Sequence, residues 1–95
     1  MEIRYELSLK MRTLKGIEEY GCFSIGEDAE FAKNLYALLG GNSELTPDLL
    51  ITIDLVKWEN AVPHPIGILH CNCEQLAENV KIITKELFKQ INLEN

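Results

Sequence analysis

The segment PHPIGILHCNCEQLAEN holds both histidines and two of the three cysteines of the chain. These side chains can bind a metal ion or carry thiol chemistry. A structural zinc site needs four ligands in a tetrahedron, and Cys71 and Cys73 supply two of them at most. His64, Cys22 or an acidic side chain would have to complete the set. A metal- or thiol-dependent site around these residues is therefore one hypothesis for the function.

The spacing of the segment argues against such a site. Successive residues of a strand point to opposite faces, so His70 and Cys71 diverge wherever the chain is extended. No second pair of ligands follows at the regular spacing of zinc fingers. Cys73 could begin a helix, where a thiol pKa falls, but Glu74 beside it opposes this effect. We expect no metal, no cofactor and no catalytic residue here.

Other catalytic patterns are weak as well. Acidic residues are plentiful, but Asp54 lies inside an expected strand and should face outward from a sheet, not into a cleft. A phosphate site requires a glycine-rich turn that leads from a strand into a helix. The one candidate, FSIGEDAEF, has a single glycine followed by acidic residues that would repel a phosphate. We therefore expect a protein that is not an enzyme.

Length and charge limit the classes of protein. The 95 residues, 46% of them hydrophobic, fit a single domain over residues 1–95. A net charge of −6 argues against nucleic acid and anionic membrane surfaces as partners. The first 15 residues lack the apolar core of a signal peptide, and no apolar run reaches the roughly 20 residues of a membrane span. Three cysteines without a disulfide spacing indicate reduced thiols. We expect a cytoplasmic protein.

Two hydrophobic periods alternate along the chain. Period-two alternation predicts strands at residues 2–12, 17–25, 50–58 and 66–71. Apolar stripes predict two helices. The first follows Asp28 and ends at Gly40-Gly41, and the second spans residues 73–91. The stripe of the first helix consists of Phe31, Leu35, Leu38 and Leu39. Asp28 should cap the first helix, and Asn72 with Gln75 the second. The segment WENAVPHP should be a turn, because its two prolines disfavour a ladder of hydrogen bonds.

The ββαββα order predicts an α+β two-layer sandwich, with a four-stranded, mainly antiparallel sheet that carries two helices on one face. The order of the strands in the sheet is not determined by the pattern. The halves match weakly, since Phe31 and Leu35 fall 45 residues before Leu76 and Val80. This match indicates a possible duplicated ββα unit.

The match between the halves also sets the expected faces of the last strand. Ile68 corresponds to Phe23, so Ile68 and His70 are expected towards the core. Leu69 and Cys71 should then lie on the open face of the sheet.

The open face carries the main functional prediction. Val56, Trp58 and Leu69 should form an apolar patch there, and exposed patches that contain Trp often mark partner surfaces. Alternatively, Trp58 packs only against its own turn. Because the core of so small a domain is thin, a homodimer would bury more apolar surface. We predict an interaction or regulatory domain that binds itself or another protein. A small-molecule site in the groove between sheet and helices is the remaining alternative.

Overall fold

The computed structural model describes residues 2–44, 46–47 and 49–93. Its elements are β1 (Ile3–Thr13), β2 (Gly16–Gly26), α1 (Ala29–Ala37), β3 (Ile51–Glu59), β4 (Val62–Cys71) and α2 (Cys73–Leu93). The α+β class and the ββαββα order are thus confirmed. All strands form one antiparallel sheet in the order β2-β1-β3-β4. Within the described residues, no helix is long and apolar enough to cross a membrane.

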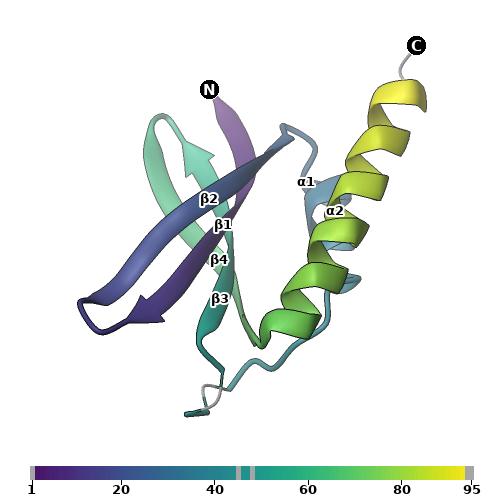
Figure 1. Cartoon of the computed structure of the whole chain (residues 1–95). Coiled ribbons are helices and arrows are strands. Elements are labelled where there is room, and N and C mark those ends of the chain that lie inside the picture. Colours follow the sequence, from purple (N-terminus) through teal and green to yellow (C-terminus); the bar gives the residue numbers. More distant parts are fainter. Residues whose placement is uncertain (1, 45, 48, 94–95) are drawn as a thin grey trace.

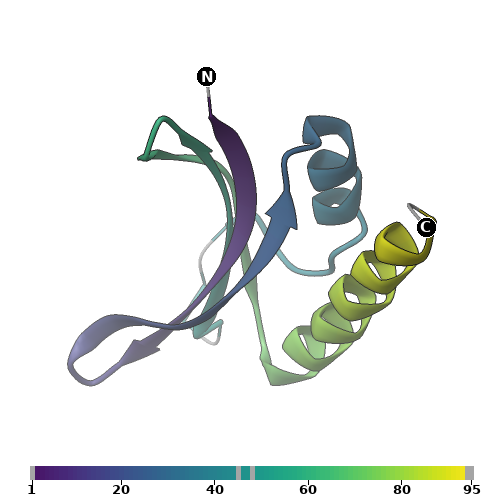
Figure 2. The same cartoon turned by 90° about the horizontal axis from the view of Figure 1, so that it is seen from above.

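The two helices lie on one face of the sheet, and the opposite face is open (Figures 1 and 2). α1 lies over β1 and the second hairpin, and α2 lies beside β2. The ring of Tyr36 in α1 lies against Gly67 in β4, while Leu87 in α2 shares a cavity wall with Ile25 in β2. The core between the layers includes the fully buried side chains Leu7, Leu35, Ile51, Ile53 and Ile83.

The two hairpins repeat the same register 46 residues apart. Phe23 pairs with Leu7 in the first hairpin, and Leu69 pairs with Ile53 in the second. Both hairpins also shift register at the equivalent step, after Leu9 in β1 and after Leu55 in β3. This correspondence supports a repeated ββ arrangement in the two halves.

An approximate twofold axis relates the hairpins. It passes through the central pair Ser8 and Asp54, which are themselves 46 residues apart and face each other across β1 and β3. The strands therefore align at an offset of 46 residues, whereas the sequence match placed Ile68 on Phe23 at an offset of 45. Because side chains alternate along a strand, this one-residue difference exchanges the two faces of β4.

The predicted faces of the last strand are consequently wrong. Cys71 is fully buried, and Leu69 packs against the core beneath the helices. Ile68 is instead 48% exposed on the open face. His70 lies on that face too, with its Nδ1 atom 3.1 Å from Oγ1 of Thr52.

The second hairpin is longer than expected because its turn is only Asn60-Ala61. Both residues have positive φ, 51° and 68°, as a two-residue type I′ turn requires. Pro63 and Pro65 lie inside β4 and not in a loop, which corrects the predicted turn WENAVPHP and the predicted start at residue 66. β4 tolerates them because it is an edge strand, where a missing N–H can face away from the ladder.

Ala61 is the clearest site of local strain, since a left-handed conformation costs an L-residue about 1–2 kcal/mol. We expect Ala61→Gly to stabilise the fold by about 0.5–1 kcal/mol after the entropy cost of glycine. Urea unfolding measures this difference. The same substitution at Ala37, in the right-handed backbone of α1, should instead lower stability. A destabilised Ala61→Gly variant would contradict the turn conformation.

The helix ends agree with the sequence. The Asp28 carboxylate accepts the N–H groups of Glu30 and Phe31 at 3.0 and 3.2 Å. Asn72 and Gln75 exchange reciprocal side-chain to backbone hydrogen bonds of 3.0 and 2.8 Å, which form a capping box.

The inward stripe of α1 differs from the predicted set. We expected Phe31, Leu35, Leu38 and Leu39 to face the sheet. The buried residues are Ala32, Leu35 and Leu39, whereas Leu38, the C-terminal cap residue, is 55% exposed.

Candidate functional site

The cysteine and histidine residues do not converge. Cys71 is in the core, where burial raises the pKa of its thiol. Cys22 pairs with Ser8 on the open side of β2, and His64 pairs with Lys57 near the second turn. Residues 2–44, 46–47 and 49–93 contain no group of three or more His, Cys, Asp or Glu side chains that could hold a metal ion. The geometry therefore gives the metal hypothesis no ligand set.

The centre of the open face is a compact polar cluster. Nζ of Lys10 lies 2.8 Å from Oδ2 of Asp54, and this hydrogen bond raises the pKa of Lys10. Beside it, Oγ of Ser8 donates to Oε1 of Glu19. Ser8 and Asp54 are only 3% and 6% exposed, so the middle of this face is largely shielded from solvent. Within the part of the chain that the structure describes, the other carboxylate oxygen of Asp54, Oδ1, is buried and has no hydrogen-bond partner.

Of the three predicted interface residues, only Val56 and Trp58 share the open face. Val56 is buried, and Leu69 lies beneath the helices, so the three do not form one patch. Nε1 of Trp58 donates to Oε1 of Glu6 at 2.7 Å, and the Arg4 guanidinium lies 4.7 Å from the centroid of the Trp58 ring. Trp58 thus contacts the neighbouring β1 strand. A role of Val56 or Trp58 in partner binding stays a prediction.

The two edges of the sheet differ in how they are protected. On β4, Pro63 and Pro65 interrupt the row of backbone donors, and the backbone of Asn42 pairs with His70 through N–O distances of 2.8 and 2.7 Å. Such features block strand addition. β2, at the other edge, has 11 residues without proline and pairs only with β1 among the described strands. Between and beyond the two bulge residues Tyr20 and Ile25, it offers backbone hydrogen-bonding groups to a further strand.

A second apolar surface runs along α2, outside the core. We call it the α2 flank, and it consists of Ala77, Val80, Thr84, Phe88 and Ile91. These residues gather on one side of a helix with 3.6 residues per turn. Lys81, Lys85 and Lys89 border them and line the same hollow. Phe88 is 67% and Ile91 61% exposed.

The orientation of the α2 flank follows from the opposite side of the helix. There Asn79 bonds to the backbone of Gly40, just beyond the end of α1. The flank therefore faces away from α1. At its C-terminal end, Leu87 and Ile91 share a cavity wall with Ser24 and Ile25 of β2. The open edge and the flank consequently lie on the same side of the molecule.

Comparison with known proteins gives no further guide to this site. The chain matches no protein-family model. The searches of curated proteins and of solved structures likewise find no significant match.

Proposed function

We propose that this chain is a non-enzymatic interaction module that forms a homodimer through the β2 edge and the α2 flank. The observation that carries the proposal is the coincidence of two unfilled surfaces on one side of the fold. Among the described strands, β2 pairs only with β1, so its other edge presents free backbone groups, and the neighbouring helix presents exposed Phe88. A second copy satisfies both at once.

Antiparallel pairing of β2 with β2 of a second copy extends the sheet to twice its width. Both α2 helices then lie on the same face, and their flanks face each other across the junction. Hydrogen bonds between the strands supply direction, while the α2 flank supplies apolar area. A stable dimer buries about 800 Å² per partner, so we infer that both surfaces contribute.

The difference between the two edges favours a closed dimer over a fibre. Pairing of β2 with β4 of another copy would leave free edges and continue indefinitely, whereas pairing of β2 with itself ends at two copies. Pro63, Pro65 and the Asn42 bridge oppose the continuing arrangement.

Charge is compatible with this pairing. Glu18 and Glu19 lie in the first half of β2. An antiparallel twofold arrangement centred near Gly21 places them opposite the uncharged second half of the other strand, Cys22–Gly26. Like charges of the two β2 strands therefore do not face each other, which removes a common penalty in strand pairing.

We expect Phe88→Gln to raise the dimer dissociation constant by about tenfold or more, because buried aromatic side chains dominate interface energies. Light scattering over a concentration series measures the mass. Leu38→Gln is the matched control, because it removes a similarly exposed apolar side chain from the end of α1 and should leave the mass unchanged. A wild-type monomer at high concentration would overturn the proposal, as would equal effects of the two variants.

A further inference from the structure

A cavity between α1 and the sheet has the size and lining of a small-molecule site. Its volume is about 370 Å³, within the usual range of about 300–1,000 Å³ for ligand pockets. None of its residues belongs to β2 or α2, so it is separate from the proposed dimer surface. The lining residues are Tyr5, Lys33, Tyr36, Leu55, Lys57 and Ile66.

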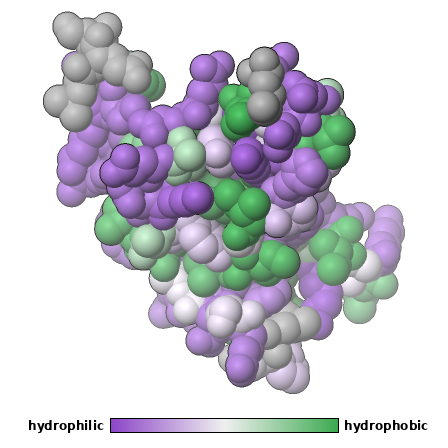
Figure 3. Space-filling model, turned by 180° about the vertical axis from the view of Figure 1, so that it is seen from behind, coloured by the Kyte–Doolittle hydropathy of each residue, from purple (hydrophilic) through white to green (hydrophobic). Residues whose placement is uncertain are grey.

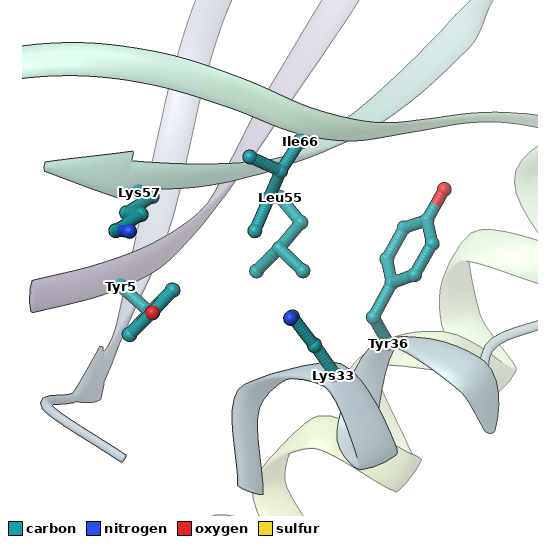
Figure 4. Close-up of a pocket in the computed structure, with 6 residues that line it drawn as sticks. All are labelled: Tyr5, Lys33, Tyr36, Leu55, Lys57 and Ile66. Atoms are coloured by element: carbon teal, nitrogen blue, oxygen red, sulfur yellow. The ribbon is translucent and has the colours of Figure 1, made fainter. Parts of the chain in front are cut away.

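The lining combines positive charge with an apolar wall (Figure 4). Lys33 extends from α1 towards Leu55, Tyr36 stands on one side of the space, and Lys57 lies with Tyr5 on the other. No acidic residue lines the cavity, although the chain has 15 acidic and nine basic residues. Two ammonium groups are thus gathered in an acidic protein.

The charges of the two lysines are not equally available. Nζ of Lys57 lies 3.8 Å from Oε2 of Glu59, so this charge is partly compensated. Lys33 forms no ion pair within the part of the chain that the structure describes. The cavity therefore has a positive charge that can be matched by one negative group.

The Tyr36 wall is built into the fold. A Cβ atom at Gly67 would lie 2.8 Å from Cζ and 3.1 Å from the hydroxyl oxygen of Tyr36, so only glycine leaves room for the ring. Burial also raises the pKa of Tyr36 above its ordinary value. Seen from behind, hydrophobic residues reach the surface between hydrophilic ones on the side where α1 and β4 lie (Figure 3).

We propose that this cavity binds a small organic acid with a single carboxylate. Lys33 and Lys57 hold the carboxylate, and the Tyr36 ring bounds the site, with its hydroxyl pointing away from both lysines (Figure 4). The apolar body of the acid packs against Leu55 and Ile66. The aliphatic wall favours such an acid over a bare inorganic anion, which would leave Leu55 and Ile66 without a contact.

Benzoate is a suitable probe, because it has one carboxylate and a compact apolar body. In a titration of the reduced protein followed by NMR, we expect saturable shifts of the Leu55 and Ile66 methyl signals at millimolar benzoate. Lys33→Gln should raise the dissociation constant about tenfold, because it removes a charge-assisted hydrogen bond. Lys81→Gln makes the same charge change on α2 and should leave the dissociation constant unchanged.

Three outcomes would overturn the inference. The first is the absence of saturable shifts in the wild-type protein. The second is an equal loss of affinity in Lys33→Gln and Lys81→Gln, which indicates non-specific attraction. The third is inorganic phosphate binding as tightly as benzoate, which indicates an anion site without an apolar subsite. The mass of the protein is independent of all three, so they do not bear on the dimer.

Discussion

Replacing Gly41 with alanine is expected to destabilise the fold by about 3–4 kcal/mol, through overpacking and an unfavourable backbone conformation together. Gly41 has a φ of 153°, and a Cβ atom there would lie 2.6 Å from the backbone oxygen of His70 and 2.9 Å from Cγ of Leu69. The His70 oxygen cannot easily retreat, because it accepts the N–H of the adjacent Asn42 at 2.8 Å. This contact joins the segment after α1 to the β4 edge.

Gly26→Ala provides the matched control for this measurement. Gly26 also has a positive φ, 97°, but a Cβ atom there would meet nothing within 4 Å. Its cost should therefore be limited to the backbone term of about 1–2 kcal/mol. Urea unfolding of both variants separates the two contributions. A Gly41→Ala variant no less stable than Gly26→Ala would show that the close approach of Gly41 and His70 is absent in solution.

Replacing Asn79 with alanine should cost about 2–3 kcal/mol, because two buried hydrogen bonds are lost at once. Oδ1 of Asn79 accepts the N–H of Gly40 at 2.8 Å, and its Nδ2 donates to the carbonyl of Gly40 at 2.8 Å. Asn79 is 1% exposed, so in the alanine variant water does not easily reach the backbone groups of Gly40 that lose their partner. This side chain fixes the end of α1 against α2.

Asn34→Ala tests whether the effect belongs to position 79 and not to asparagine in a helix. Asn34 is the counterpart of Asn79 at the 45-residue offset of the sequence match, but it is exposed on α1. Its replacement should change the free energy of unfolding by no more than about 0.5 kcal/mol. Comparable losses in the two variants, measured by thermal or urea unfolding, would contradict the clamp that Asn79 forms.

The strands β1, β2 and β3 could be predicted from the sequence, and the edge strand β4 only in part. β1 alternates cleanly because one of its faces meets the core along its whole length. In β4 the register shift at Leu55/Val56 places an extra residue, Ile66, in the edge strand. The period of two is broken there. The wrong face of β4 came from matching Ile68 to Phe23 at an offset of 45 residues, where the strands align at 46.

The surfaces proposed for function were harder to predict, because they depend on the strand order. A strand is an edge only after the sheet is assembled, and the pattern left that order open. The sequence held one signal of the difference between the two edges, because β2 has no proline and β4 has two. The cavity at Lys33 and Lys57 depends on which helix covers which hairpin, and no local pattern reports this. The predicted patch of Val56, Trp58 and Leu69 was wrong about Leu69, because the two faces of β4 were assigned the wrong way round.

Amide hydrogen exchange of β2, measured at low and high protein concentration, tests the proposed dimer most directly. Half of the β2 amides point away from β1 and should be protected only when a second copy pairs with the strand. We expect these amides within Gly16–Gly26 to exchange more slowly as concentration rises, while those of β4 do not change. Exchange in β2 that is independent of concentration, or protection that rises equally in β4, would contradict a dimer closed by the β2 edge.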